Sequence, residues 1–198
     1  MTEPKPLPFS TPLTGISDKT LAIHHDKLYA GYVTKKNEIQ GKLDELIKKG
    51  DFASANQSYS ELRGLMDGET FAVNGVYLHE WYFDVLGGNG NAEGPLVEAL
   101  AAQYGSIENF IAYFSACGLA ARGWVVLCWD TKEQKLCVYQ ADSHNQGGIW
   151  GCMPIIVMDV YEHAYFIDYG SDGKAYIADF WKNFNWAKAN ELFAASKK

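Results

Sequence analysis

The chain lacks any long apolar run, and this absence excludes a membrane-spanning helix. No run in the 198 residues approaches the roughly 20 apolar residues that cross a bilayer. The first ten residues, MTEPKPLPFS, also lack the basic-then-apolar layout of a secretory signal. We therefore expect a cytoplasmic protein that has no membrane partner.

Basic runs and paired cysteines are missing as well. The formal net charge is −7 and no segment is rich in Lys or Arg, which argues against nucleic acid as a partner. The cysteines form no CxxC pair and no zinc-type spacing, so we expect them to be small core residues. They are Cys117, Cys128, Cys137 and Cys152.

Apolar and aromatic residues, by contrast, are plentiful. Hydrophobic residues make up 47% of the chain and aromatic residues 14%, which is ample for a packed core. The clearest cluster of structure-breaking residues is GGNGNAEGP at 87–95. We place a domain boundary there, between an N-terminal domain at 1–88 and a C-terminal domain at 89–198.

The N-terminal domain is expected to be helical. After a Pro-rich extended arm, Ser17 has the character of a helix N-cap. Helical periodicity then predicts one long helix over 18–49, a second over 52–66 and a third over 70–86.

The C-terminal domain mixes helices with β-rich runs. The elements expected there are helices at 94–103 and 106–121, strands at 123–130, 135–142 and 154–160, and a final helix at 173–195. The fold class is therefore α+β: an N-terminal helical hairpin domain followed by an α/β domain with a small three-stranded antiparallel sheet.

Only five histidines occur, and two of them lie on apolar helix faces. His24 shares its face with Leu28 and Tyr32, and His79 shares its face with Tyr82 and Phe83. Either histidine alone is typical of a core residue that hydrogen-bonds a backbone carbonyl.

A third histidine changes this interpretation. In MDVYEHAYFIDY, Asp159 and His163 are four residues apart in an apolar and aromatic run, and burying charged groups is costly unless something compensates them. Together with His24 and His79 they would offer three imidazoles and one carboxylate, a plausible ligand set for a first-row transition metal. Spacing alone leaves the assignment open, because the other two histidines are far away in sequence.

Five segments together resemble the iron/manganese superoxide dismutases. DVYEHAYFIDY is similar to the family signature DVWEHAYY, and the other segments follow in the family's order over nearly the whole chain. They are IHHDKLYAGYV (23–33), VYLHEWYFDVL (76–86), ARGWVVL (121–127) and FWKNFNW (180–186).

The resemblance implies a reaction and a ligand set. One Fe or Mn ion per subunit would cycle between its +3 and +2 states and convert two superoxide anions and two protons to O₂ and H₂O₂. The metal ligands would be His24, His79, Asp159 and His163, which explains why charged groups could be buried at 159 and 163.

The resemblance also assigns residues around the metal. Tyr32 would be the gateway tyrosine near the substrate channel, and Trp124 would form a wall of the pocket. Glu162 would reach across the twofold interface of a homodimer to His163 of the other subunit.

One departure from the family concerns the residue that tunes the metal. Relatives supply a Gln for this purpose, either four residues before the second ligand or from the sheet. The first position is Gly75 here, and the second aligns with His144. We therefore expect His144 to take this role, with Gln146 as the alternative donor.

A second departure lies at the expected dimer interface. Leu28 and Phe166 occupy positions where many relatives have a His and a Tyr that bond across the dimer. Losing both polar partners together leaves neither group unpaired, so we expect an apolar gate. Val157, bulkier than the Gly common in manganese enzymes, favours iron.

Two other functions are considered. A metal-binding scaffold or interaction protein could have kept the fold with little turnover, and only the Leu28 and Phe166 replacements favour it. A non-haem iron oxygenase would need two histidines, one carboxylate and open positions, which a fourth ligand opposes. The sequence leaves the choice between Fe and Mn, and between dimer and tetramer, open.

Overall fold

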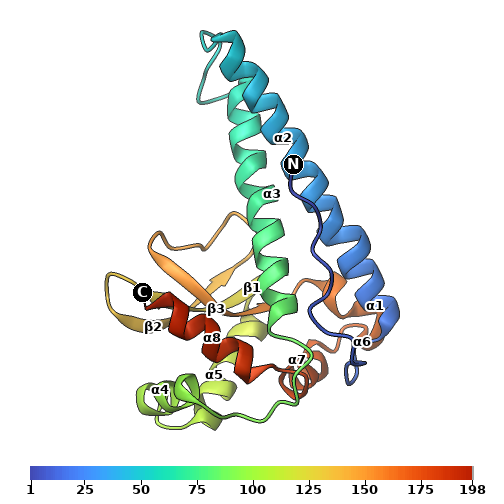
Figure 1. Ribbon diagram of the computed structural model, residues 1–198, viewed down its shortest axis with the longest axis vertical. Coiled ribbons are helices and arrows are strands. Elements are labelled where there is room, and N and C mark those ends of the chain that lie inside the picture. Colours follow the sequence, from blue (N-terminus) through green and yellow to red (C-terminus); the bar gives the residue numbers. More distant parts are fainter. Residues whose placement is uncertain (198) are drawn as a thin grey trace.

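The structure, a computed structural model, describes residues 1–197. After the extended arm, helix α1 (Asp18–Ile23), the π-helical turn η1 (His24–Tyr29) and helix α2 (Ala30–Lys49) form one long rod. Ser17 caps this rod as predicted, because its side chain accepts a hydrogen bond from the Thr20 N–H. Helix α3 (Glu61–Asp84) runs back beside α2, and the two project from the body of the molecule as a hairpin (Figure 1).

The predicted helices at 52–66 and 70–86 were wrong, because residues 61–84 form a single helix. Gly68 does not end it. A side chain there would lie 3.3 Å from Ile39 of α2, so the glycine allows the two helices to pack closely. The helix begins at Ser60, whose hydroxyl accepts from the Arg63 N–H.

The C-terminal half contains the sheet and the remaining helices. Its elements are α4 (Pro95–Tyr104), α5 (Ile107–Ala120), β1 (Trp124–Asp130), β2 (Lys135–Ala141), β3 (Cys152–Asp159), the 3₁₀ turn η2 (Glu162–Ala164), α6 (Phe166–Tyr169), α7 (Gly173–Lys182) and α8 (Trp186–Ser196).

The predicted final helix at 173–195 was also wrong, since it is divided into α7 and α8. At the break, the Asn183 side chain accepts from the Thr14 N–H at 2.7 Å and donates to the Thr14 carbonyl at 2.8 Å. Asn185 then caps α8 by accepting from the Lys188 N–H. Both side chains use their polar groups to end one helix and begin the next.

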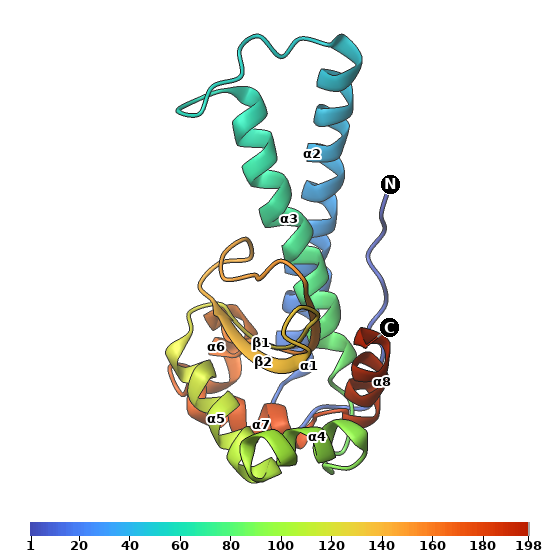
Figure 2. The same cartoon turned by 90° about the vertical axis from the view of Figure 1, so that its left-hand side faces the viewer.

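The sheet is antiparallel in the order β2-β1-β3, which confirms the predicted α+β fold class. Trp124 of β1 lies opposite Asp159 of β3, and α3 covers this face of the sheet. Trp129 points to the other face, where it contacts Phe193 of α8. Figure 2 shows the hairpin above the sheet and helices α4, α5 and α7 below it.

One hydrophobic core fills the body of the molecule. It includes the apolar run of β3 and a group of fully buried aromatic residues from α5, α7 and β1. Cys128 lies in this core as predicted, whereas the other three cysteines are half-buried, and all four are free thiols.

Within residues 1–197, no helix combines the length and apolar composition needed to cross a membrane. The domain boundary after residue 88 stays a prediction, and the last residue of the second predicted domain, Lys198, lies outside the described residues.

Candidate metal centre

The first two predicted ligands come from the base of the hairpin. His24 is the first residue of the π-helical turn and His79 lies on α3, and both are buried. Their rings meet edge to face with centroids 5.0 Å apart. Single π-helical turns are rare and often occur at functional sites, and sequence periodicity gave no sign of this one.

The other two predicted ligands come from the end of the sheet. Asp159 is the last residue of β3, and His163 follows in η2. The Tyr161 N–H donates to Asp159 Oδ1 at 2.9 Å, which fixes the carboxylate and leaves Oδ2 toward the histidines.

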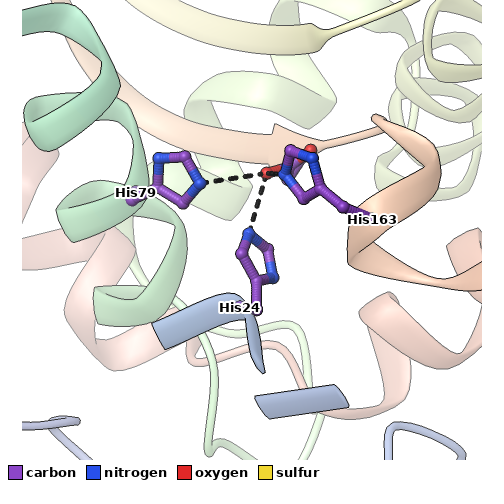
Figure 3. Close-up of side chains that lie close together, drawn as sticks. His24, His79 and His163 are labelled. Atoms are coloured by element: carbon purple, nitrogen blue, oxygen red, sulfur yellow. Dashed lines mark hydrogen bonds and ion pairs between the residues drawn. The ribbon is translucent and has the colours of Figure 1, made fainter. Parts of the chain in front are cut away.

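All four side chains converge on one point (Figure 3). The distances from Asp159 Oδ2 to Nε2 are 3.0 Å for His24, 3.2 Å for His163 and 3.7 Å for His79. One nitrogen or oxygen from each residue lies within 4.8 Å of all the others. The structure therefore brings together residues that are up to 139 positions apart.

The hydrogen bonds of His79 test whether this cluster suits a cation. Its Nδ1 lies 2.5 Å from the Gly75 carbonyl oxygen, which can only accept, so Nδ1 carries the proton and Nε2 has a free lone pair. Among the described residues, His79 Nε2 is a buried nitrogen that has no hydrogen-bond partner. Such orphaned polar atoms are costly. A metal ion between the four residues would satisfy it, and three imidazoles with one carboxylate suit iron or manganese.

The pKa values point the same way. Burial lowers the pKa of His24, and burial together with the neighbouring His24 lowers the pKa of His79 to about 3. Burial alone would raise the pKa of Asp159, but His163 and His24 outweigh it and hold that pKa well below its usual range. The fold thus keeps two imidazoles neutral and the carboxylate ionised, which are the forms that bind metals.

Two further predicted residues, Trp124 and His144, are joined beside the cluster. Trp124 is fully buried and its ring meets that of His79 edge-on at 5.0 Å. Its indole N–H donates to His144 Nδ1 at 2.9 Å. Since burial lowers the pKa of His144 to about 4, this histidine is neutral and carries its single proton on Nε2.

Tyr32 lies on the same side of the cluster. Its ring centroid is 4.6 Å from that of His144 and 5.3 Å from that of His79. A side chain on Gly75 would lie 2.9 Å from Tyr32 ring atoms, so the position used by many relatives has no room for a glutamine. Gln146 is exposed whereas His144 is buried, which favours His144 over the alternative donor.

Comparison with known proteins identifies the family. The family model described as iron/manganese superoxide dismutases, alpha-hairpin domain, matches residues 9–87. The model described as iron/manganese superoxide dismutases, C-terminal domain, matches residues 92–192. The chain belongs to the iron/manganese superoxide dismutases.

Individual relatives agree. The chain is 40% identical over 188 residues to a superoxide dismutase (Fe) of Aquifex aeolicus, covering 94% of this chain and 88% of the relative. It is 37% identical to a superoxide dismutase (Fe) of Cupriavidus metallidurans over 93% of this chain and 91% of the relative. It is 34% identical to superoxide dismutase (Mn) 1 of Halobacterium salinarum over 90% of this chain and 86% of the relative. The predicted activity, superoxide dismutation with iron or manganese, is confirmed.

In this superoxide dismutase, the last predicted site residue, Glu162, is exposed next to His163. The His163 side chain is 26% exposed, the most open of the four. Among residues 1–197, its Nδ1 makes no hydrogen bond, since the only bond of this side chain runs from Nε2 to Asp159. Phe166 nearby is 54% exposed, and Leu28 is half-buried.

Two residues that the sequence analysis did not assign also shape the site. Tyr161 stacks on His163 with centroids 5.1 Å apart, and it lies inside the DVYEH signature, where its position was an available signal. Phe71 lies 4.5 Å from the ring of His144. It belongs to the segment that was expected to begin a separate helix, and no motif marked it.

Proposed function

We propose that dismutation takes place at the cluster of His24, His79, Asp159 and His163, which would hold one iron or manganese ion. The observation that carries this proposal is the buried, unpartnered Nε2 of His79, aimed at the same oxygen as the other two imidazoles. When bound, the ion would supply the one-electron chemistry that takes one superoxide to O₂ and, with two protons, another to H₂O₂.

His144 is proposed to donate its Nε2 proton toward the position that the four ligands leave open. The bond from Trp124 fixes its tautomer, and burial keeps it neutral. Donors of this kind stabilise negative charge, so the distance from His144 to the open position would tune the metal's redox potential. Trp124 acts through His144 and through its contact with His79.

Tyr32 is proposed to guard the entrance to the open position. Burial raises the pKa of its phenol, so the hydroxyl remains protonated at neutral pH and can donate to an incoming anion. Its ring occupies the space that a side chain at position 75 would need.

The working enzyme is proposed to be a homodimer. Any larger assembly would be built from such dimers. The free Nδ1 of His163 and the exposed carboxylate of Glu162 are complementary donor and acceptor groups that could pair across a twofold axis. Leu28 and Phe166 would form the apolar gate beside this pair.

Iron is favoured over manganese because the fully buried Val157, two residues before Asp159, is bulkier than the Gly common in manganese enzymes. We propose a cytoplasmic enzyme with two domains, 1–88 and 89–198, each of which supplies two ligands.

Metal reconstitution tests the proposal. Metal-free protein loaded separately with Fe²⁺ or Mn²⁺ should take up one ion per chain and consume superoxide, with higher activity in the iron form. His25→Ala is a matched control, since His25 neighbours a ligand but bonds the Lys5 carbonyl and Asp26. Stoichiometric metal without superoxide consumption would favour the scaffold alternative.

A further inference from the structure

Two tyrosines lie beside the backbone oxygen of Asp159. Tyr82 belongs to α3 and Tyr176 to α7, and both side chains are fully buried. The Tyr176 hydroxyl lies 2.7 Å from the Asp159 backbone oxygen and 3.1 Å from the Tyr82 hydroxyl. Neither residue was assigned a role from the sequence.

The direction of these hydrogen bonds follows from proton counting. A carbonyl oxygen only accepts, so Tyr176 must donate its single proton to Asp159. Tyr82 must therefore donate to the Tyr176 oxygen. Burial raises the pKa of both phenols, so each keeps its proton at neutral pH.

This chain of bonds meets the main chain where the edge strand β3 ends. The next residue, Val160, donates its N–H to the Gly123 carbonyl, and Asp159 lies opposite Trp124 at the last pair of the ladder. Tyr176 thus secures the main chain of Asp159, while the Tyr161 N–H secures its side chain.

The pair also reaches the ligands of the hairpin. The Tyr82 ring lies 5.2 Å from the ring of His24, and Tyr82 follows His79 by three residues on α3. The Tyr82 ring also stacks on Phe180 of α7, with ring centroids 6.2 Å apart. The Tyr82–Tyr176 pair therefore connects α7, the end of β3 and both ligand-bearing segments of the hairpin.

We infer that Tyr176 is a positioning residue for Asp159 and that Tyr82 orients Tyr176, so that the pair sets how tightly the centre holds its cation. The inference rests on the proposed ligand set. Residues that orient metal ligands typically change metal affinity by about 10- to 100-fold when they are removed.

Tyr176→Phe tests this role, because it removes the donor and keeps the ring. We expect Fe²⁺ and Mn²⁺ affinity, measured by competition with a chelator, to fall about 10- to 100-fold. Tyr82→Phe leaves the bond to Asp159 intact but removes its support, so its metal affinity should fall measurably, but by less than that of Tyr176→Phe. The visible absorption of the oxidised metal should shift in Tyr176→Phe.

Tyr169→Phe is the matched control. Tyr169 lies beside Tyr176, with ring centroids 5.9 Å apart, and its hydroxyl donates to Asp179 at 2.7 Å without touching a ligand. Both variants should lower the melting temperature of the metal-free protein, but the control should keep wild-type metal affinity.

Equal metal affinities for Tyr176→Phe and Tyr169→Phe would overturn the inference. If Tyr176→Phe does not fold, Tyr82→Phe provides the test. Wild-type metal affinity in Tyr82→Phe would then refute the inference. Failure of the proposed ligand set would look different. In that case the wild-type protein and Asp159→Ala would bind the same amount of metal.

Discussion

The hairpin has two halves that differ in what holds them together. Its outer half contains a small separate cluster in which only Ile39, Leu43 and Ala72 are buried. Its base, which carries His24 and His79, is part of the main core of the molecule. The base is held by the C-terminal half through the sheet and α7, whereas the outer half projects into solvent (Figure 1). The four clustered residues are therefore held by packing between distant segments, and the outer half contributes little to it.

The largest difference between these regions should appear on deleting a ligand at the base. His79→Ala and Asp159→Ala should each abolish stoichiometric metal binding and superoxide consumption together, because each removes one of four donors. Metal analysis beside a superoxide assay measures both. A variant with full metal content and full turnover would show that its residue is not a ligand.

Changes beside the ligands should separate metal binding from turnover. His144→Ala should keep its metal but lose about 100-fold or more in activity, as expected when one charge-stabilising donor is removed. His144→Gln should stay active with a changed ratio of iron to manganese activity. Metal loss in His144→Ala, with no fall in activity per bound ion, would contradict the proposed role.

At the exposed edge of the base, Glu162→Ala should act through assembly. We expect a weaker dimer by light scattering and a loss of metal retention of about 10- to 100-fold, because His163 would lose its orienting partner. Glu108→Ala, an exposed carboxylate at the start of α5, serves as the control and should change neither. A Glu162→Ala protein that is monomeric but keeps full metal and activity would contradict the proposal that the dimer supports the metal centre.

Lowering the pH should reduce the unfolding free energy of the metal-free protein through His144. Burial lowers the pKa of folded His144 to about 4, below the usual 6.5 of histidine, so the unfolded chain binds the proton first as the pH falls. This contribution is fully present above pH 6.5 and is lost between pH 6.5 and 4, to a limit of about 3 kcal/mol. Urea unfolding at several pH values measures it. His144→Gln should show a smaller loss over this range, and an equal loss in both proteins would exclude His144 as the cause.

The smallest effects should come from the outer half. Leu43→Ala should cost about 2 kcal/mol of unfolding free energy, the lower end for a buried leucine, because its cluster is small and close to solvent. Tyr59→Ser, at a side chain 88% exposed, should cost less than about 0.5 kcal/mol. Both should keep wild-type metal affinity, and a fall in affinity would mean that the two halves of the hairpin are coupled.

Much of the site could be predicted from sequence because it lies in local motifs. The proposed ligands His24, His79, Asp159 and His163 each occur in a segment that resembles the family, and the α+β class follows from the change of periodicity after residue 122. The predicted continuous helix at 173–195 failed for a different reason. Asn183 ends α7 by bonding Thr14, 169 positions away, and no local pattern contains that information.

Local sequence patterns also gave no sign of the two tyrosines that contact each other beside Asp159. Tyr82 and Tyr176 are 94 residues apart and meet only in the folded chain, and in sequence each is one aromatic residue on an apolar helix face. The π-helical turn at His24 likewise has no periodic signature. The side chains proposed to hold the ligands in place were therefore less visible in the sequence than the proposed ligands.

Anomalous diffraction from crystals of the iron-loaded or manganese-loaded protein tests the central claim most directly. Data collected on both sides of the metal's absorption edge should give one peak per chain, in contact with Nε2 of His24, His79 and His163 and with Oδ2 of Asp159. A peak bound by other residues, or no peak in protein that consumes superoxide, would contradict it.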